Sequence, residues 1–363
     1  MASINKRGEY QWEAQVRRQG YPNQSKTFVS KAEAQAWAST VESEMARGIF
    51  VRRSESERTT LEALILRYLS EVAPQNRGAE VEKMQLRAIL RDPLAKRFLA
   101  TLTGGDFATF RDNRLNGRNG HRRIKPATSV KELQLIKRIL NIAKREWDIY
   151  IPENPVGNIR LPRVNNARTR RLQSIEEQYL MAALEPVQRE DNGTFGDGAR
   201  NFWARPAICL AIATAMRRGE ILGLRWKYVD LHRRVARLPV TKNGDPRDVP
   251  LSSEAIAILK ALPQSLDGRV FPISPESLKK CWQRAITRAK DAYCNDCANA
   301  NQRPDEEFLV DFRFHDLRHE ATTRMADRIR NPLELARITG HRDLKMLLRY
   351  YNVSAEELAQ KLG

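Results

Sequence analysis

Residues 314–320 read FHDLRHE, and they place two histidines and one arginine within about two turns of a predicted helix. His315 and Arg318 are three residues apart, so their side chains project from one face of that helix, whereas His319 points elsewhere. The whole chain has only 5 histidines, which makes this grouping uncommon here. Three explanations are open: a metal site, a surface patch, or two side chains that converge on one phosphate.

The chain around this stretch is strongly basic. It has 363 residues, 63 Lys+Arg against 44 Asp+Glu, a formal net charge of +19 and 41% hydrophobic residues. The length and apolar content predict two or three folded domains. The charge predicts a polyanion as partner, usually nucleic acid. A basic surface that serves only solubility is the less favoured alternative.

Nothing in the sequence indicates a membrane or secreted protein. There is no run of about 18 apolar residues, and the N-terminus, MASINKRGEYQW, lacks the apolar core of a signal peptide. Four cysteines in a chain of this length do not make a disulfide framework. We therefore expect a cytoplasmic protein without a membrane partner.

Residues 1–53 are expected to form a small unit of a β-sheet and one helix. YQWEAQVRR (10–18) alternates apolar and polar residues, SKTFV (25–29) predicts a second strand, and Ser30 can cap a helix that stops near Gly48. A basic sheet of this kind can enter a DNA major groove, although a dimerisation or packing module is the alternative. The candidate DNA contacts here are Arg17, Arg18 and Lys26.

Residues 54–160 are predicted to form a helical domain. Apolar residues recur at helical spacing in 60–72 and again in 129–147. Between these helices, 111–125 is a basic run with two glycines, which favours a phosphate-binding loop over a merely solvated one. Its candidate DNA contacts are Arg111, Arg114, Arg118, Arg122, Arg123 and Lys125.

Residues 161–172 are predicted to be a basic interdomain linker, followed by a last domain at 173–363. The proline-rich stretch 153–172 has no helical period, and its charge suggests that it crosses a DNA backbone. In the last domain, 233–251 predicts two strands joined by a KNGD turn, and the remainder is mostly helical. The candidate DNA contacts near the linker are Arg160, Arg163, Arg168, Arg170 and Arg171.

A metal site is the weaker explanation of FHDLRHE. A structural zinc needs three or four Cys, His or carboxylate ligands, and Cys294 and Cys297 form a single CxxC with no second pair. A lone CxxC in a loop is more often incidental. We expect no metal and no cofactor.

The phosphate explanation has more support, because further cations and two tyrosines follow in order. Arg217 lies on an otherwise apolar helix with Glu220 three residues later, where the carboxylate can hold the arginine. Lys242 is at a hairpin tip, and His341 follows Gly340. The adjacent tyrosines are Tyr350 and Tyr351.

Four stretches together resemble the tyrosine recombinases, or phage-type integrases. They are TAMRRGEILGLRW (214–226), TKNGDPRDVPL (241–251), FHDLRHEATTRMA (314–326) and ITGHRDLKMLLRYYNVSAEELAQKL (338–362). Their sequences most resemble those of shufflon-type recombinases and prophage integrases. The resemblance implies a mainly α fold with small β-sheets: an arm-binding-like N-terminal unit, a helical core-binding domain and a mixed α/β catalytic domain with a C-terminal tail helix.

The resemblance also implies a site-specific recombinase that integrates, excises or inverts DNA of mobile elements without metal or ATP. Its family pattern places the nucleophile directly after an arginine, which selects Tyr350 over Tyr351. The chemistry of phosphoryl transfer asks for fixed cations on the developing charge, a proton donor to the 5′-oxygen and an acceptor for the tyrosine proton. The implied catalytic set is Arg217, Lys242, His315, Arg318, His341 and Tyr350, with Glu220 and His319 behind it.

For partners, the resemblance implies double-stranded recombination sites in a bacterial nucleoid, with accessory DNA-bending or directionality proteins. The free protein is expected to be largely monomeric and to form a tetramer on DNA, with Ser354–Leu362 as a helix that docks on a neighbouring protomer. Two segments, 185–203 and 293–308, are longer than the family pattern and are expected to be loops. A type IB topoisomerase and a non-catalytic DNA-binding regulator are the alternative functions.

Overall fold

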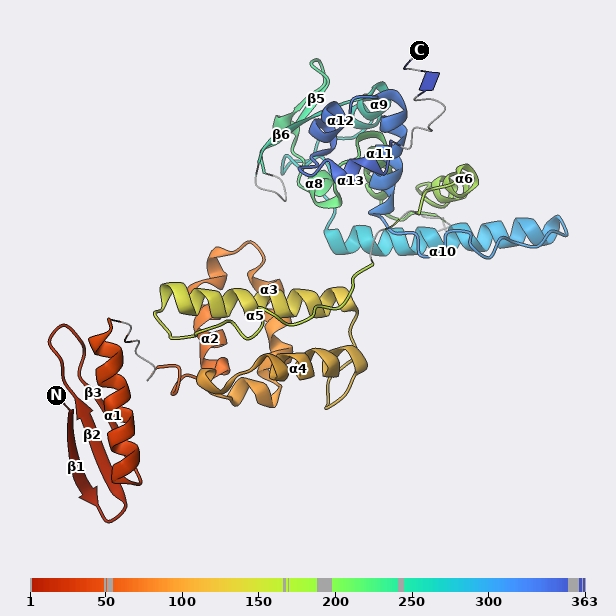
Figure 1. Cartoon of the computed structure of the whole chain (residues 1–363). Helices are drawn as coiled ribbons and strands as arrows, with labels where there is room; N and C mark the ends of the chain where they lie inside the picture. The colour runs from red at the N-terminus through yellow and green to blue at the C-terminus, as the bar shows by residue number, and fades with distance from the viewer. Residues whose placement is uncertain are drawn as a thin grey trace. The chain divides into compact units, whose positions relative to one another are not determined.

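The computed structural model describes residues 2–48, 50, 55–165, 168, 170–187, 198–240, 245–351, 359–360 and 362. Its contacts divide the chain into two compact units, Met1–Asn166 and Ala167–Gly363. Figure 1 shows the elements of each unit in chain order. Within the described residues the fold is mainly helical with two small antiparallel sheets, so the expected fold class is confirmed.

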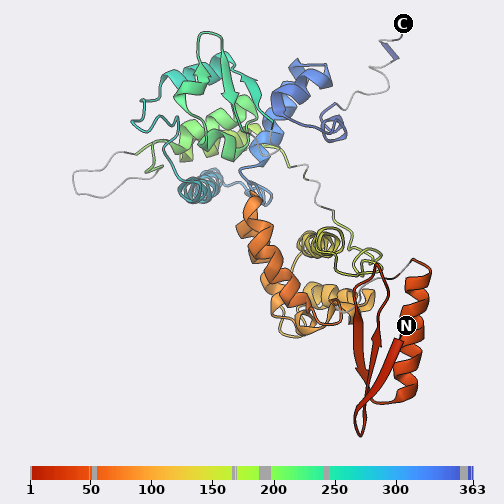
Figure 2. The same cartoon turned by 90° about the vertical axis from the view of Figure 1, so that its left-hand side faces the viewer.

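The chain begins with a three-stranded antiparallel sheet backed by one helix. The strands are β1 (Ala2–Gly8), β2 (Gln11–Val16) and β3 (Gln24–Phe28), in the order β1-β2-β3, and the helix is α1 (Lys31–Ala46). Figure 2 shows α1 along one face of the sheet, where Ala14 and Val16 are fully buried. As predicted, Ser30 caps α1 by accepting a hydrogen bond from the backbone N–H of Glu33. Strand β1 was missed because ASINKRG lacks a clear apolar alternation.

The remainder of the first unit is helical, as predicted for residues 54–160. Its helices are α2 (Leu61–Glu71), α3 (Ala79–Leu90), α4 (Gly104–Asn116) and α5 (Pro126–Glu146), with short 3₁₀ turns at 73–75, 93–96 and 99–101. The predicted apolar positions Leu61, Leu64 and Leu133 are among its buried core residues. The basic run 111–125 is only partly a loop, because 111–116 form the end of α4. Gly117 then stops the helix with a φ of 68°.

The second unit holds eight described helices and a three-stranded sheet at one side. The helices are α6 (Ser174–Ala183), α7 (Ala204–Thr214), α8 (Arg218–Leu222), α9 (Ser253–Lys260), α10 (Pro275–Asn299), α11 (Asp316–Arg328), α12 (Pro332–Thr339) and α13 (Lys345–Leu348). The sheet has the order β4-β5-β6, from β4 (Val229–Asp230), β5 (Val235–Leu238) and β6 (Arg247–Pro250), after a 3₁₀ turn at 226–228. The predicted strand pair is therefore present, and its turn residues 241–244 lie outside the described part of the chain.

Helix α7 is the centre of this unit. Ala207, Ile208 and Leu210 on it are fully buried, and it packs against both α9 and α11. It ends at Ala215, which has a left-handed φ of 53° and a backbone N–H bonded to the carbonyl of Ala211. This tight turn brings the next residues, Met216 and Arg217, off the buried helix and into the start of α8.

Helix α10 corrects one expectation. Cys294 and Cys297 lie on this 25-residue helix and not in a loop, because Tyr293 stacks on Phe308 with ring centroids 3.9 Å apart and pins the helix end to the returning chain. In Figure 1, α10 is the long helix at the edge of the second unit. Among the described residues, no group of three or more His, Cys, Asp or Glu side chains is placed to hold a metal ion.

Two further predictions concern membrane-spanning segments and the C-terminal tail. No described helix is long and apolar enough to cross a membrane. The predicted tail helix, 354–362, falls mostly outside the described residues, which resume only at 359–360 and 362.

Candidate active site

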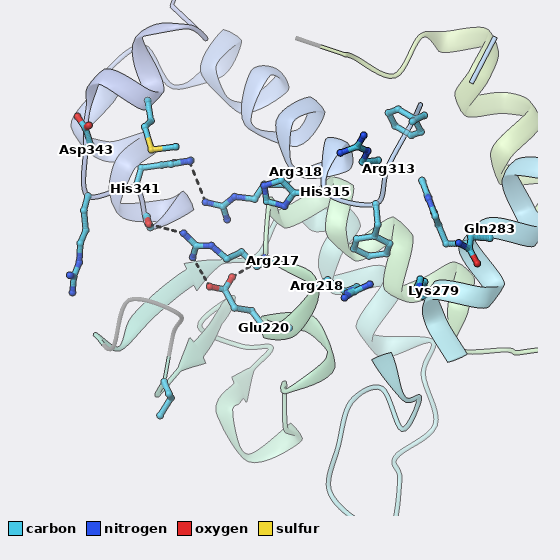
Figure 3. Close-up of a pocket in the computed structure, with 18 residues that line it drawn as sticks. Arg217, Arg218, Glu220, Lys279, Gln283, Arg313, His315, Arg318, His341 and Asp343 are labelled. Atoms are coloured by element: carbon cyan, nitrogen blue, oxygen red, sulfur yellow. Dashed lines mark hydrogen bonds and ion pairs between the residues drawn. The ribbon is translucent and has the colours of Figure 1, made fainter. Parts of the chain in front are cut away.

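A cavity of about 1250 Å³ in the second unit brings together side chains that are far apart in the sequence. Arg217, His315, Arg318 and His341 all line it, as Figure 3 shows. They come from the start of α8, the start of α11 and the turn after α12. Of the other two predicted catalytic residues, Lys242 lies outside the described residues, and Tyr350 does not line the cavity.

Arg217 is held by Glu220, as the sequence predicted. Its Nη1 lies 2.8 Å from Glu220 Oε1, and its backbone N–H donates to Glu220 Oε2 at 2.8 Å. The Arg217 Nη2 donates to the carbonyl of Gly340 at 3.2 Å. Glu220 therefore caps the short helix α8 and fixes the direction of the guanidinium at the same time.

Arg318 is buried within this wall, with only 5% of its surface exposed. Nη1 donates to the carbonyl of Ala215 at 2.6 Å, and Nη2 donates to the carbonyl of Thr339 at 2.5 Å. Burial, followed by the nearby charges of Arg217 and Arg247, lowers the pKa of Arg318 to about 9. It still carries a full charge at neutral pH, and that charge is disfavoured until an anion approaches.

His341 is held as a neutral imidazole. Burial, with the charges of Arg318 and Arg217, lowers its pKa to about 3. Its Nδ1 is 2.7 Å from Thr339 Oγ1, and the single hydroxyl proton of Thr339 is already donated to the carbonyl of Leu335 at 2.6 Å. His341 Nδ1 must therefore carry the proton, which leaves Nε2 as an acceptor 3.5 Å from Arg318 Nη2.

Arg247 belongs to the same group and was not selected from the sequence. Its side chain is 9% exposed, and its Nη2 lies 2.6 Å from Glu220 Oε2. Its Nη1 donates to the carbonyl of Ile338. Burial alone would raise the pKa of Glu220, but the charge of Arg247 and the hydrogen bonds from Arg217 lower it overall. The only sequence signal was a basic residue at the inner end of a strand, which is not specific.

His319 is absent from the cavity lining, unlike His315 and Arg318, but it makes a contact that the sequence did not predict. Its Nδ1 is 2.5 Å from the Tyr350 hydroxyl oxygen. The helix geometry alone was not enough to exclude this contact, because the chain after α13 returns to the face of α11 that carries His319. Burial lowers the pKa of His319 and raises the pKa of Tyr350, so burial favours the neutral form of both groups.

The two adjacent tyrosines have different surroundings. The Tyr351 hydroxyl donates to the backbone carbonyl of Ile329 at 2.7 Å, at the end of α11. Tyr350 packs beside a small buried cluster of Ala326, Leu335 and Leu347, and its hydroxyl faces a titratable side chain. Tyr351 thus has a structural contact, whereas the hydroxyl of Tyr350 contacts a group that can accept a proton.

The charges of the cavity wall favour an anion. Arg217 and Arg318 line the cavity, and Arg247 lies behind them. Glu220 pairs with Arg217 and Arg247, and its charge also acts on Arg318. Arg218, Arg313 and Lys279 also line the cavity (Figure 3). A planar arginine matches two oxygens of a phosphate, so this wall can bind a phosphodiester and stabilise charge that develops on it.

Three of the predicted DNA contacts are less accessible than expected, because their side chains are wholly or partly buried in pairs with buried carboxylates. Arg114 is buried and bonds Glu132, with Nε 3.0 Å from Oε2. Arg168 holds the fully buried Asp316 with its Nη2 2.6 Å from Oδ2, and Arg170 pairs with the buried Glu176. Arginine count in a segment does not distinguish such internal pairs from free cations.

The other predicted DNA contacts are at the surface or close to it. Arg111 is half-buried, bonds Asp112 and donates to the carbonyl of Arg160. Lys26 pairs with Glu57, and Arg171 pairs with Glu320, but both side chains remain exposed. The remaining exposed candidates are Arg17, Arg18, Arg118, Arg122, Arg123, Lys125, Arg160 and Arg163.

Comparison with known proteins places this arrangement in a family. Residues 170–357 match the model of the phage integrase family. The chain is 38% identical to a shufflon-specific DNA recombinase of Escherichia coli over 303 residues, which cover 82% of this chain and 70% of that protein. It is 33% identical to a putative integrase/recombinase of Haemophilus influenzae over 362 residues, covering 97% of this chain and 87% of that protein.

Solved structures show the same fold at lower sequence identity. The Tn1549 transposon integrase in complex with circular intermediate DNA matches with a TM-score of 0.61 and 19% identity, over 84% of this chain and 99% of that one. A lambda integrase tetramer bound to a Holliday junction matches with a TM-score of 0.59 and 17% identity, over 96% and 94% of the two chains.

Proposed function

Because the chain belongs to the phage integrase family and is a site-specific tyrosine recombinase, we propose that Tyr350 cuts DNA and holds it as a covalent 3′-phosphotyrosine. The observation that carries this proposal is the shared cavity. Arg217, His315, Arg318 and His341 come from separate segments of the chain and line one basic cavity. A DNA-binding regulator without catalysis would have no need to place them together.

In the proposed reaction the Tyr350 oxygen attacks the phosphorus, and the bond from phosphorus to the 5′-oxygen breaks. Arg217 and Arg318 bind the nonbridging oxygens, where negative charge develops in the transition state. The tyrosine proton passes to His315, and the departing 5′-oxygen takes a proton from Lys242. Attack of a 5′-hydroxyl on the phosphotyrosine reverses these steps and joins the new strand.

His341 would complete the phosphate site only after gaining a proton. In the free protein its Nε2 is an acceptor, and a phosphate oxygen is also an acceptor, so the two would repel. A bound phosphate raises the pKa of a nearby imidazole, because it stabilises the charged form. His341 would then donate from Nε2 to a nonbridging oxygen.

Tyr350 must also change its contact before it attacks. Its hydroxyl is hydrogen-bonded to His319, and Tyr350 does not line the cavity. We keep His315 as the proton acceptor because it lines the cavity, and we assign His319 to holding the hydroxyl before attack. Metal and ATP have no step in this scheme.

The other segments would bind the DNA around the cut site. In this proposal residues 1–53 bind a separate arm sequence, 54–160 form a core-binding domain, 161–172 are a basic linker and 173–363 are the catalytic domain. The exposed arginines and lysines of the first three segments would contact phosphates. Whether the outcome is integration, excision or inversion depends on the arrangement of the sites and on accessory DNA-bending proteins.

Recombination joins two duplexes, so four protomers would assemble on DNA from a largely monomeric free protein in the bacterial cytoplasm. The segment 354–362 would dock on a neighbour and link the active sites in pairs. Native mass spectrometry with and without DNA tests this assembly. A stable tetramer of the free protein, or full-rate recombination by a chain truncated after Val353, would contradict it.

The function itself can be tested on duplexes of random sequence. The protein is incubated with a library of nicked duplexes of randomised sequence, and duplexes that become covalently attached are recovered and sequenced. We expect one enriched sequence, here termed the captured duplex, which supports strand exchange between two copies. Relaxation of supercoils without strand exchange would indicate a topoisomerase, and the absence of covalent attachment would indicate a DNA-binding regulator.

A further inference from the structure

Helix α12 ends in an arrangement that the proposed chemistry does not by itself explain. Its last two residues and the following glycine present three successive carbonyl oxygens, and each accepts a hydrogen bond from a different arginine. The carbonyl of Gly340 accepts from Arg217, that of Thr339 from Arg318 and that of Ile338 from Arg247. Two of these arginines are proposed phosphate ligands, and the third is not in the cavity lining.

The end of a helix is a favourable place for these bonds. The last carbonyls of an α-helix have no partner within the helix and carry the negative end of its dipole. Gly340 has a left-handed φ of 70°, and it closes the helix with a bond from its N–H to the carbonyl of Ala336 at 2.7 Å. His341 follows at once, so whatever fixes these carbonyls also fixes the position of His341.

Arg247 connects this helix end to the support of Arg217. One of its nitrogens bonds Ile338 on α12, and another lies 2.6 Å from Glu220, the carboxylate that holds Arg217. The contact is close-packed as well as polar, since a Cβ placed on Gly340 would lie 3.0 Å from both Cδ and Nε of Arg247. Arg247 is also the first residue of β6, and the sequence between β5 and β6 includes Lys242.

We propose that Arg247 is a positioning residue for strand cleavage, which holds Arg217 and the Gly340–His341 turn at a fixed separation by bridging Glu220 and the carbonyl of Ile338. It acts through its neighbours and does not touch the phosphate. The inference rests on the phosphate-binding roles proposed for Arg217 and His341. A small displacement of such groups is costly, because the attacking and charge-stabilising atoms must be aligned closely.

Two substitutions separate the proposed role from simple stabilisation. Arg247→Gln removes the positive charge and the planar guanidinium. Arg247→Lys keeps a charge, but its single ammonium group can reach only one of the two acceptors, Glu220 or the Ile338 carbonyl. Arg237→Gln is the matched control, because Arg237 is exposed on the neighbouring strand β5 of the same hairpin. Each full-length variant is assayed for affinity to the captured duplex, for the single-turnover rate of covalent attachment and for melting temperature.

We expect Arg247→Gln to slow covalent attachment by about 10- to 100-fold with unchanged DNA affinity. The attachment rate of Arg247→Lys should lie between those of Arg247→Gln and the wild type, and the rate of Arg237→Gln should equal that of the wild type. Because Arg247 acts through Glu220, adding Glu220→Gln should cause little further loss beyond the slower single variant. If Arg247→Gln does not fold, Arg247→Lys is combined with Glu220→Gln in the same double-mutant comparison, because a lysine can still pair with Glu220.

Two results would overturn the inference. One is wild-type attachment by Arg247→Gln and Arg247→Lys. The other is a double variant whose loss equals the product of the two single losses, because independent effects indicate separate structural roles. Failure of the wild type and of Arg237→Gln to attach to DNA would instead count against the proposed function.

Discussion

The arginine wall of the cavity and the segment that carries Tyr350 are built in opposite ways. Arg318 is 5% exposed, and the two wall arginines, Arg217 and Arg318, together with Arg247 behind them, are each bonded to a backbone carbonyl at the end of α12. The segment with Tyr350 follows a four-residue helix whose only buried residue is Leu347, while Leu344, Met346 and Leu348 are 40% to 60% exposed. The half of the site that we propose stabilises charge is therefore preorganised, and the proposed nucleophile follows a short and largely exposed helix.

This difference suggests how the two halves divide the work. A recombinase must keep its phosphate site ready and yet cut only within an assembled complex. A rigid arginine wall costs no reorganisation at the moment of reaction, whereas the Tyr350 hydroxyl contacts His319 and Tyr350 does not line the cavity. On this account, assembly on DNA acts on the Tyr350 segment and leaves the wall unchanged.

The largest effect is expected from the nucleophile itself. Tyr350→Phe should bind the captured duplex normally and form no covalent adduct, because only the attacking oxygen is lost. Tyr351→Phe should still form it, since the Tyr351 hydroxyl serves only a backbone contact. Gel analysis of denatured protein–DNA mixtures checks both. Adduct formed by Tyr350→Phe and lost in Tyr351→Phe would reverse the assignment.

The next effect tests the wall. Arg217→Ala or Arg318→Ala should slow cleavage by about 100-fold or more, as does removal of a preorganised donor to a developing oxyanion. Addition of EDTA should leave the wild-type rate unchanged. A rate that collapses with EDTA and returns with zinc or magnesium would show that a metal ion carries the charge instead.

A smaller and more selective effect distinguishes the two histidines of FHDLRHE. His315→Gln should slow cleavage by about 100-fold, the usual lower range for loss of a general base. His319→Gln should lose much less, because it removes a contact that the hydroxyl gives up before attack. Single-turnover rates on the captured duplex decide between them. A larger loss at His319 would make it the proton acceptor.

The smallest expected effect is a change in the protonation state of His341 when DNA binds. In the free protein at pH 7 it should be neutral with its proton on Nδ1, since its pKa is lowered to about 3 and Thr339 accepts from Nδ1. Binding of the captured duplex to Tyr350→Phe should raise the pKa and yield the imidazolium. Nitrogen NMR of ¹⁵N-histidine-labelled protein reads both states. A proton on Nε2 in the free protein would contradict the hydrogen-bond network.

The sequence predicted those parts of the site that depend on local pattern. Arg217 with Glu220, and His315 with Arg318, are close in sequence, and the order of motifs indicated that they meet. Arg247 was missed because its partners lie 27 and 91 residues away and only the tertiary fold joins them. The contact between His319 and Tyr350 was missed for the same reason, because it depends on the return of the chain after α13.

The fold followed the same rule. Helices with clear apolar periodicity, such as α2 and α5, were predicted close to their observed bounds. The edge strand β1 and the end of α10 were missed, since the first has little apolar pattern and the second is fixed by aromatic packing with Phe308. Arg114, Arg168 and Arg170 show that charge in a sequence does not reveal which cations are already paired.

The most direct test of the central claim is to locate the DNA on the protein. The adduct with the captured duplex is treated with nuclease and trypsin, and the peptide 350–361, YYNVSAEELAQK, is sequenced by tandem mass spectrometry. The account predicts a nucleotide remnant on the first tyrosine, Tyr350. A remnant on Tyr351, or on any residue outside this peptide, would contradict it.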